Sequence, residues 1–316
     1  MARDTPWRGA SHHLRLWPPH TSDAYEEARR ERNHFRPSYH QQDEMAPKYT
    51  LHYWPQIPGR GEYIRLAFEY SDVPYAENND VTKLQALLDE SAPTGSPHHF
   101  ALPLLEITEG SQRQLISQTP AILLYLSQQI PRLYNSQTEA KSATATATAT
   151  ATTHIHTHQV LLTVLDLSNE VHDTHHPIGA GLYYEDQKPE AARRARDLRE
   201  ERLPKFLTYF DQLLTNLEGR VAIKGQTTVA DLALWQVLEG LNFAFPQWCK
   251  RAREAGQYAK VWEFQRSVGE EDRIKAYVES GRRKPFSDGL FRHYPELDAA
   301  EGEGEGEGET KKRRVE

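Results

Sequence analysis

Residues 49–65 read YTLHYWPQIPGRGEYIR, and three kinds of local pattern follow one another in them. Apolar and polar side chains alternate over residues 49–54, and this period of two predicts a β-strand with Tyr53 on its apolar face. Proline and glycine break the pattern over residues 55–61, where we expect a turn. Apolar residues then recur at helical spacing over residues 62–70. The stretch therefore predicts a strand, a turn and a helix.

The next part of the chain continues as an α/β pattern. Three further strands are predicted, at residues 74–77, 102–107 and 114–117. A helix follows, for which Thr119 is a plausible N-cap and Pro120 a suitable first helical residue. The order strand, helix, strand, helix, hairpin and helix predicts an α/β domain over residues 45–133.

After residue 133 the α/β pattern ends and the remaining pattern is that of helices alone. Helices are predicted at residues 160–172, 189–217, 228–241 and 272–280, with no convincing strand among them. Thr228 and Asp231 have the spacing of a capping box, which fixes the start of a helix and is structural. We therefore expect an all-α C-terminal domain over residues 159–298.

Three segments of biased composition lie outside these domains. Residues 1–44 lack apolar periodicity and hold as many acidic residues as arginines, so we expect a disordered extension and no targeting signal, with Met45 as an alternative start. Residues 134–158 include alternating Thr and Ala, and we expect an inserted linker loop there. Residues 299–316 are expected to be a disordered charged tail, although their basic cluster also resembles a nuclear import signal.

Composition narrows the classes of function. The 316-residue chain has a formal net charge of −7, which gives no general attraction for nucleic acid or an anionic membrane, and no apolar run is long enough to span a membrane. The single cysteine, Cys249, excludes an intramolecular disulfide and favours a reducing, cytoplasmic compartment. His154, His156 and His158 could bind zinc, but they adjoin low-complexity sequence and no Cys, Asp or Glu stands close to them in the sequence, so we expect no metal.

Four segments, in this order, resemble the cytosolic glutathione transferase family, closest to tyrosine classes such as pi, mu and sigma. They are residues 51–65, the pair Leu102-Pro103, the helix start SQTPAILLYL at residues 117–126, and TVADLAL at residues 228–234. The resemblance spans nearly all of residues 47–295. It implies a thioredoxin-like domain that binds glutathione, an all-α domain behind it, and a homodimer.

The implied chemistry requires the glutathione thiolate. A thiol with a pKa near ~8.5 is mostly protonated at neutral pH, so a hydroxyl that donates a hydrogen bond to the sulfur is needed. Tyr53, at the end of the first strand, is the candidate catalytic residue, and a half-buried structural tyrosine is the alternative interpretation. Arg60, in the turn, is expected to support the site.

Other residues are expected to hold the rest of the tripeptide. Gln118 and Thr119 begin a helix, whose free N–H groups suit the γ-glutamyl carboxylate. If the bond before Pro103 is cis, Leu102 can offer its backbone to the cysteinyl part.

The resemblance also suggests two further contacts. Lys83 is a candidate for the glycyl carboxylate, because the family's usual Trp and Lys have no clear counterpart here. Asp173 stands near the position from which some classes reach the glutathione amine across the dimer. The turn after Tyr53 is about one residue longer than in the tyrosine classes.

The resemblance therefore implies a transferase that conjugates glutathione to an apolar electrophile in detoxification, with isomerase or peroxidase chemistry as variants. We expect Tyr183, Tyr184 and Trp235 to form a wall for the electrophile, with residues 172–176 lining or covering the cleft. The alternative is a non-catalytic glutathione-binding or interaction protein that keeps the fold.

Overall fold

A mixed four-stranded sheet forms the first half of the fold in the computed structural model, which describes residues 48–90, 97–133 and 143–299. Its strands are β1 (Lys48–His52), β2 (Tyr75–Asn78), β3 (Leu104–Glu109) and β4 (Gln112–Ser117). They lie in the order β2-β1-β3-β4, with β1 and β2 parallel and the other neighbours antiparallel. The expected strands are thus confirmed.

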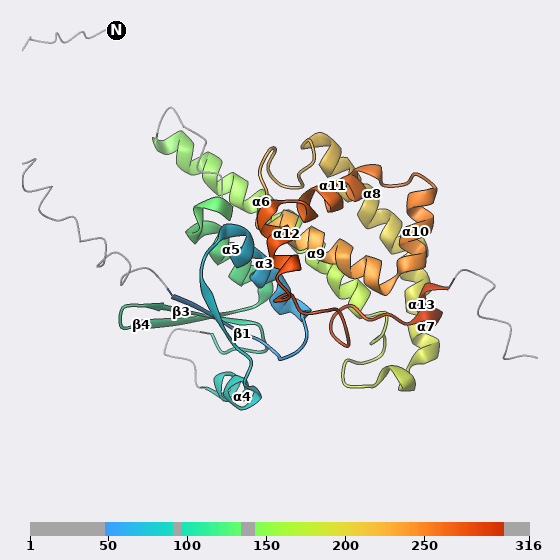
Figure 1. The fold of residues 1–316 in the computed structure, drawn as a ribbon, viewed down its shortest axis with the longest axis horizontal. Helices are drawn as coiled ribbons and strands as arrows, with labels where there is room; N and C mark the ends of the chain where they lie inside the picture. Colours follow the sequence, from blue (N-terminus) through green and yellow to red (C-terminus); the bar gives the residue numbers. More distant parts are fainter. Residues whose placement is uncertain (1–47, 91–96, 134–142, 300–316) are drawn as a thin grey trace, which may run out of the picture. The chain divides into compact units, whose positions relative to one another are not determined.

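Helices cover both faces of this sheet (Figure 1). Helices α3 (Glu62–Ser71) and α5 (Thr119–Gln129) lie on one face, and α4 (Val81–Asp89) lies on the other. Two short 3-10 turns, η1 (Gly59–Gly61) and η2 (Pro131–Leu133), precede α3 and follow α5. The expected α/β order is therefore confirmed.

The rest of the described chain is helical, as the sequence predicted. Its elements are α6 (Ala143–His172), η3 (Tyr184–Asp186), α7 (Lys188–Asp197), the π-helical segment η4 (Leu198–Arg202), α8 (Leu203–Asn216), α9 (Val229–Ala244), α10 (Pro246–Glu254), α11 (Ala259–Gly269), α12 (Asp272–Glu279) and α13 (Pro295–Asp298). The helix predicted at residues 189–217 is the continuous run of α7, η4 and α8. Helices α10 and α11 were not predicted from the sequence.

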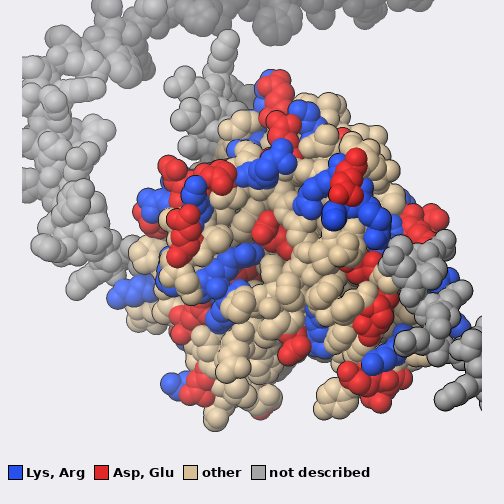
Figure 2. All heavy atoms as spheres, turned by 45° about the vertical axis from the view of Figure 1, so that its right-hand side comes forward, with Lys and Arg blue, Asp and Glu red and all other residues tan. Residues whose placement is uncertain are grey.

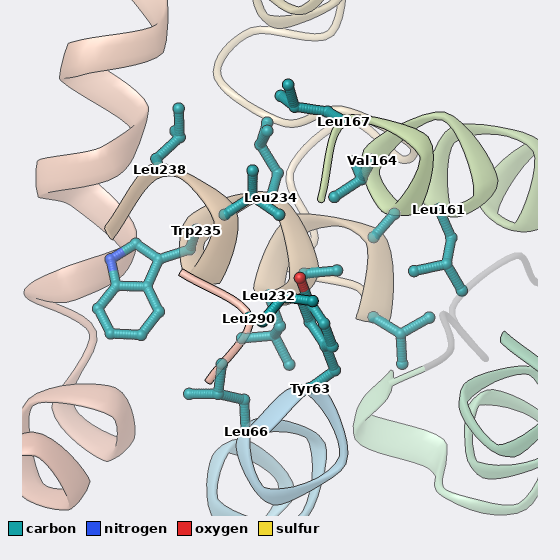
Figure 3. Packing of buried hydrophobic residues seen from close by; sticks show 14 of the residues in the cluster. Tyr63, Leu66, Leu161, Val164, Leu167, Leu232, Leu234, Trp235, Leu238 and Leu290 are labelled. Atoms are coloured by element: carbon teal, nitrogen blue, oxygen red, sulfur yellow. The ribbon is translucent and has the colours of Figure 1, made fainter. Parts of the chain in front are cut away.

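One apolar core joins the sheet domain to the helical domain. Figure 3 shows side chains of α3, α6 and α9 meeting, with Leu290 of the C-terminal segment packed among them. The Tyr63 hydroxyl of α3 lies 2.7 Å from the Ser168 hydroxyl of α6, so the buried phenol has a polar partner. The helical domain is thereby fixed against the helix that follows the Tyr53 turn.

The start of α9 confirms the predicted capping box. Asp231 accepts a hydrogen bond from the Thr228 backbone N–H at 2.9 Å, and it also accepts one from the Val221 N–H at 3.0 Å. The carboxylate therefore fixes both the helix start and the preceding loop.

The expected linker loop needs correction, and some other expectations concern residues that the structure does not describe. The Thr/Ala segment from Ala143 onward is helical, because alanine is the strongest helix former and α6 extends through it. His154, His156 and His158 consequently sit on a helix, where residues two apart do not face each other. The expectations for residues 1–44, 134–142 and 300–316 fall outside the described chain.

Charged side chains of both signs are interspersed on the face shown in Figure 2. No described helix is long and apolar enough to cross a membrane. Within the same residues, no group of three or more His, Cys, Asp or Glu side chains is arranged to hold a metal ion.

Candidate functional site

Tyr53 follows β1 directly and lies buried beneath the turn that leads into α3. The Arg60 backbone N–H donates a 2.7 Å hydrogen bond to the Tyr53 hydroxyl oxygen. That contact uses the oxygen as an acceptor, so the hydroxyl hydrogen can be donated to a ligand. Burial raises the pKa of Tyr53, although the Arg60 N–H opposes the shift, so the phenol keeps its proton at neutral pH.

Glycine is required where the turn crosses the Tyr53 ring. A Cβ atom added to Gly59 would lie 2.2 Å from the Tyr53 hydroxyl oxygen, and Gly59 has a φ of +46°. A Cβ atom on Gly61 would lie 2.7 Å from the ring carbon Cγ. Both glycines therefore allow the backbone to approach the phenol closely enough to hydrogen-bond it.

The sheet register brings Tyr53 beside the other predicted glutathione contacts. His52 of β1 pairs with Leu104 of β3, and Leu104 also pairs with Ser117 of β4. Tyr53, Pro103 and Gln118 are the next residues beyond these pairs, so they lie at the same end of three adjacent strands. Sequence spacing alone could not show this, because the register joins residues more than 50 positions apart.

The backbone at this end of the sheet has two special features. The Leu102–Pro103 peptide bond is cis, as the predicted use of Leu102 requires. Gln118 has a φ of 72° and is the residue before α5, where it makes no side-chain capping bond. The expected cap is thus shifted by one residue, because Thr119 is the first helical residue and Pro120 the second.

The buried hydroxyl of Thr119 indicates that the start of α5 is suited to bind a polar ligand. The residue is buried, yet its Oγ1 atom has no hydrogen-bond partner within the described part of the chain. A buried hydroxyl without a partner is costly, and the free N–H groups of a helix start bind anions. A carboxylate bound at the start of α5 would accept hydrogen bonds from the Thr119 hydroxyl and from the free backbone N–H groups.

Two predicted contacts lie elsewhere. Lys83 is on α4 with its side chain 73% exposed, and its ammonium lies 3.9 Å from the Asp80 carboxylate. Asp173 follows α6 with its side chain 52% exposed, and its carboxylate lies 3.1 Å from Nδ1 of His172 in the same chain. The structure does not bring either residue into a described contact with the three strand ends.

The expected aromatic wall is only partly present. Tyr183 is 78% exposed and available, whereas Tyr184 stacks on Tyr294 at 3.7 Å between ring centroids. Trp235 is buried in α9, and the Arg283 guanidinium lies 4.9 Å from its ring centroid. Tyr184 and Trp235 are thus packing residues, because neighbouring rings and charges already cover them.

Arg65 of α3 supports the turn that leads into this helix. Its guanidinium donates to the Pro58 backbone carbonyl at 3.0 Å and to the Glu62 carboxylate at 3.1 Å. It also pairs with Glu77 of β2 at 2.8 Å. The partners of Arg65 raise its pKa in spite of burial, so this buried cation stays charged and fixes the turn carrying Arg60.

Arg60 links the turn to the helical domain. Its guanidinium donates to Oδ1 of Asn169 on α6 at 2.8 Å. The single residue Arg60 therefore touches the Tyr53 hydroxyl through its backbone and α6 through its side chain. Asn169 carries no sequence signal that would have identified it as part of the site.

Three histidines pack together where α6 ends. The ring centroids of His172, His175 and His176 lie 4.8 to 5.0 Å apart. His175 is 1% exposed, and its Nε2 atom lies 3.2 Å from the Leu290 carbonyl oxygen, which requires a hydrogen on Nε2. Burial, together with the nearby His172, Arg292 and His176, lowers the pKa of His175 to about 3, although the hydrogen bond to the Leu290 carbonyl opposes the shift.

His175 is expected to make the fold sensitive to acid. Its pKa falls from 6.5 to about 3 on folding, so its contribution to stability is present above pH 6.5 and is lost as the pH falls toward 3. At pH 5 the loss is about 2 kcal/mol. Urea unfolding at pH 7.5 and pH 5 should show this loss, and His175→Phe should reduce it. The exposed His156→Gln is the control, and an equal pH dependence in all three proteins would contradict the prediction.

Comparisons with known proteins agree with this architecture. Residues 172–281 match a family model described as the glutathione S-transferase C-terminal domain. A sigma-class glutathione S-transferase of Fasciola hepatica is 18% identical with a TM-score of 0.55, over 76% of this chain and 98% of that one. Prostaglandin synthase D of Nilaparvata lugens is 18% identical with a TM-score of 0.53, over 76% of this chain and 100% of that one. A search of curated proteins found no match. At these identities the likeness is one of fold.

Proposed function

We propose that this chain is a cytosolic-type glutathione S-transferase that adds the glutathione thiolate to an apolar electrophile, and the match of residues 172–281 to the C-terminal domain model and the fold support this proposal. The observation that carries the proposal is the meeting of Tyr53, Pro103 and the start of α5 at one end of the sheet. A cytoplasmic homodimer acting in detoxification is part of the same proposal.

The residues present fit the γ-glutamyl and cysteinyl parts of glutathione. The free N–H groups at the start of α5 and the unpartnered Thr119 hydroxyl suit the γ-glutamyl carboxylate. The backbone of Leu102 suits the cysteinyl part, which would pair with it as an added strand does. The cysteinyl sulfur would then lie toward Tyr53, at the end of the neighbouring strand.

Tyr53 would hold the sulfur as a thiolate. The Arg60 N–H fixes the phenol oxygen, so the hydroxyl hydrogen is directed away from the turn. A hydrogen bond from a neutral hydroxyl to the anionic sulfur lowers the thiol pKa, because it stabilises only the charged form. The thiolate then attacks the electrophile, which is the nucleophilic step of the reaction.

Glutathione binding tests this proposal before any substrate is known. We expect calorimetry to detect binding of both glutathione and S-methylglutathione, because the tripeptide contacts do not depend on a free thiol. Thr119→Val should weaken binding about tenfold, which is about 1.4 kcal/mol. Thr215→Val is the matched control, since the Thr215 hydroxyl bonds only its own helix in α8 at 2.8 Å among its described contacts.

The outcomes separate the two classes of function. Binding together with conjugation of an activated aryl halide supports a transferase. Binding without conjugation would support a non-catalytic glutathione-binding protein. An absence of binding to either ligand would contradict both.

A further inference from the structure

A groove of about 490 Å³ lies in the helical domain, between residues of α9, α11 and α12. Trp235 and Glu239 are four positions apart and share one face of α9. Gln265 and Gly269 have the same spacing on α11. None of the lining residues belongs to the strand ends where glutathione is proposed to bind. Small-molecule sites have volumes in this range, so the groove is a candidate for a second ligand site.

Trp235 places a hydrogen-bond donor without a partner beside this groove. The residue is 3% exposed, and its Nε1 atom has no hydrogen-bond partner among the residues that the structure describes. A buried indole N–H usually finds an acceptor. The Arg283 guanidinium lies 4.9 Å from the ring centroid, whereas the nitrogen is at the ring edge, turned away from Leu234 and Leu290 (Figure 3). The N–H can therefore donate to an acceptor that a ligand supplies.

Gly269 leaves space beside this N–H group. A Cβ atom added to Gly269 would lie 3.3 Å from Nε1 of Trp235, in the place that an acceptor would take. Glycine costs a helix about 1 kcal/mol relative to alanine, and the φ of Gly269 is not in the left-handed region, so its backbone does not require glycine. The N–H is closed off from solvent, so a ligand must displace a long side chain at the rim, and such rotamer changes on binding are common.

The charged residues that line the groove are of both signs. The Lys275 ammonium lies 2.8 Å from the Glu270 carboxylate, and Glu239 accepts a hydrogen bond from Gln265 at 2.6 Å. The charged side chains in the lining are Arg253, Arg266 and Lys275, which are basic, and Glu239, Glu270 and Glu279, which are acidic. A ligand with one charge would meet like charges as well as opposite ones. A ligand that carries both charges can pair with groups of each sign.

We propose that this groove binds a zwitterionic α-amino acid with an apolar side chain. The ligand carboxylate would accept a hydrogen bond from the Trp235 N–H beside Gly269. The ligand ammonium would pair with the acidic side chains of the lining, and its apolar group would lie against Val278 of α12, which is 41% exposed. The inference does not depend on the proposed transferase function, because the groove lies outside the glutathione site.

Calorimetry on the full-length protein at pH 7 tests the class of ligand with three probes. L-Phenylalanine carries both charges, 3-phenylpropionate lacks the ammonium, and phenethylamine lacks the carboxylate. We expect L-phenylalanine to bind about tenfold or more tightly than either of the others, because each of these loses a charge-assisted hydrogen bond. Binding of 3-phenylpropionate as tight as that of L-phenylalanine would overturn the proposal, and so would an absence of binding by all three probes.

Two variants test the position of the site. Gly269→Ala should weaken binding of L-phenylalanine about tenfold or more, because the added Cβ takes the place of the carboxylate, while alanine favours the helix. Trp235→Phe should weaken binding by a similar factor, because the N–H donor is lost. Gly181→Ala is the matched control, since a Cβ atom there meets nothing within 4 Å. Equal affinity in Gly269→Ala and the unsubstituted protein would contradict the assignment of this groove.

A competition experiment separates this groove from the proposed glutathione site. L-Phenylalanine resembles the γ-glutamyl end of glutathione, because both carry an α-ammonium and an α-carboxylate. Saturating S-methylglutathione should leave the affinity for L-phenylalanine unchanged if the two ligands occupy different sites. Loss of L-phenylalanine binding in its presence would overturn the proposal, because the amino acid would then occupy the start of α5.

Discussion

Replacing Glu62 by alanine is expected to lower the free energy of unfolding by about 3–5 kcal/mol. Glu62 is fully buried, and its carboxylate accepts from Arg65 at 3.1 Å and from the Tyr277 hydroxyl at 3.1 Å. The Arg283 guanidinium lies 3.3 Å away. Removing the carboxylate leaves these buried donors with one partner fewer, and a buried cation that loses a partner is costly.

The effect should extend to the Tyr53 turn, because Glu62 and Pro58 share Arg65 as a hydrogen-bond donor. Denaturant unfolding measures the change. Glu62→Gln should cost less, since its amide oxygen can still accept from Tyr277. Glu254→Ala is the surface control, because Glu254 is 65% exposed and lies 3.9 Å from Lys250. If Glu62→Ala and Glu254→Ala lowered the free energy of unfolding equally, the buried hydrogen bonds of Glu62 would not stabilise the fold as predicted.

Replacing Tyr53 by phenylalanine is expected to reduce glutathione conjugation about a hundredfold or more. Phenylalanine keeps the ring between Gly59 and Gly61, so the turn stays packed, while the hydroxyl donor to the sulfur is lost. The bound thiol should then return toward its ordinary pKa of ~8.5. The Arg60 N–H also loses its acceptor, at a cost of about 1–3 kcal/mol, so unfolding must be measured alongside turnover.

Local patterns in the sequence predicted the elements that depend on neighbouring residues. The alternation before Tyr53, the breakers after it and the capping box at Thr228 all describe interactions within a few positions. The resemblance then supplied the Leu102–Pro103 pair, whose cis bond the structure contains. These features were predictable because each depends on residue type at a fixed short spacing.

The sequence could not predict features that depend on distant contacts or on ambiguous composition. Glu62 and Arg283 are 221 positions apart, and His175 and Leu290 are 115 apart, so no local pattern joins them. The Thr/Ala repeat at the start of α6 has the composition of a loop and continues a helix. Trp235 was assigned to a substrate wall, although α9 is apolar on nearly every side and therefore buried.

The pKa of the thiol of bound glutathione tests the central claim most directly. Thiolate absorbance in the ultraviolet is followed from about pH 5 to 9, a range that brackets the ordinary thiol pKa of ~8.5, for the unsubstituted protein and for Tyr53→Phe. The proposed function predicts that bound glutathione ionises well below that value in the unsubstituted protein and near it in the variant. Bound glutathione with an ordinary thiol pKa in both proteins would contradict the claim that Tyr53 stabilises a thiolate.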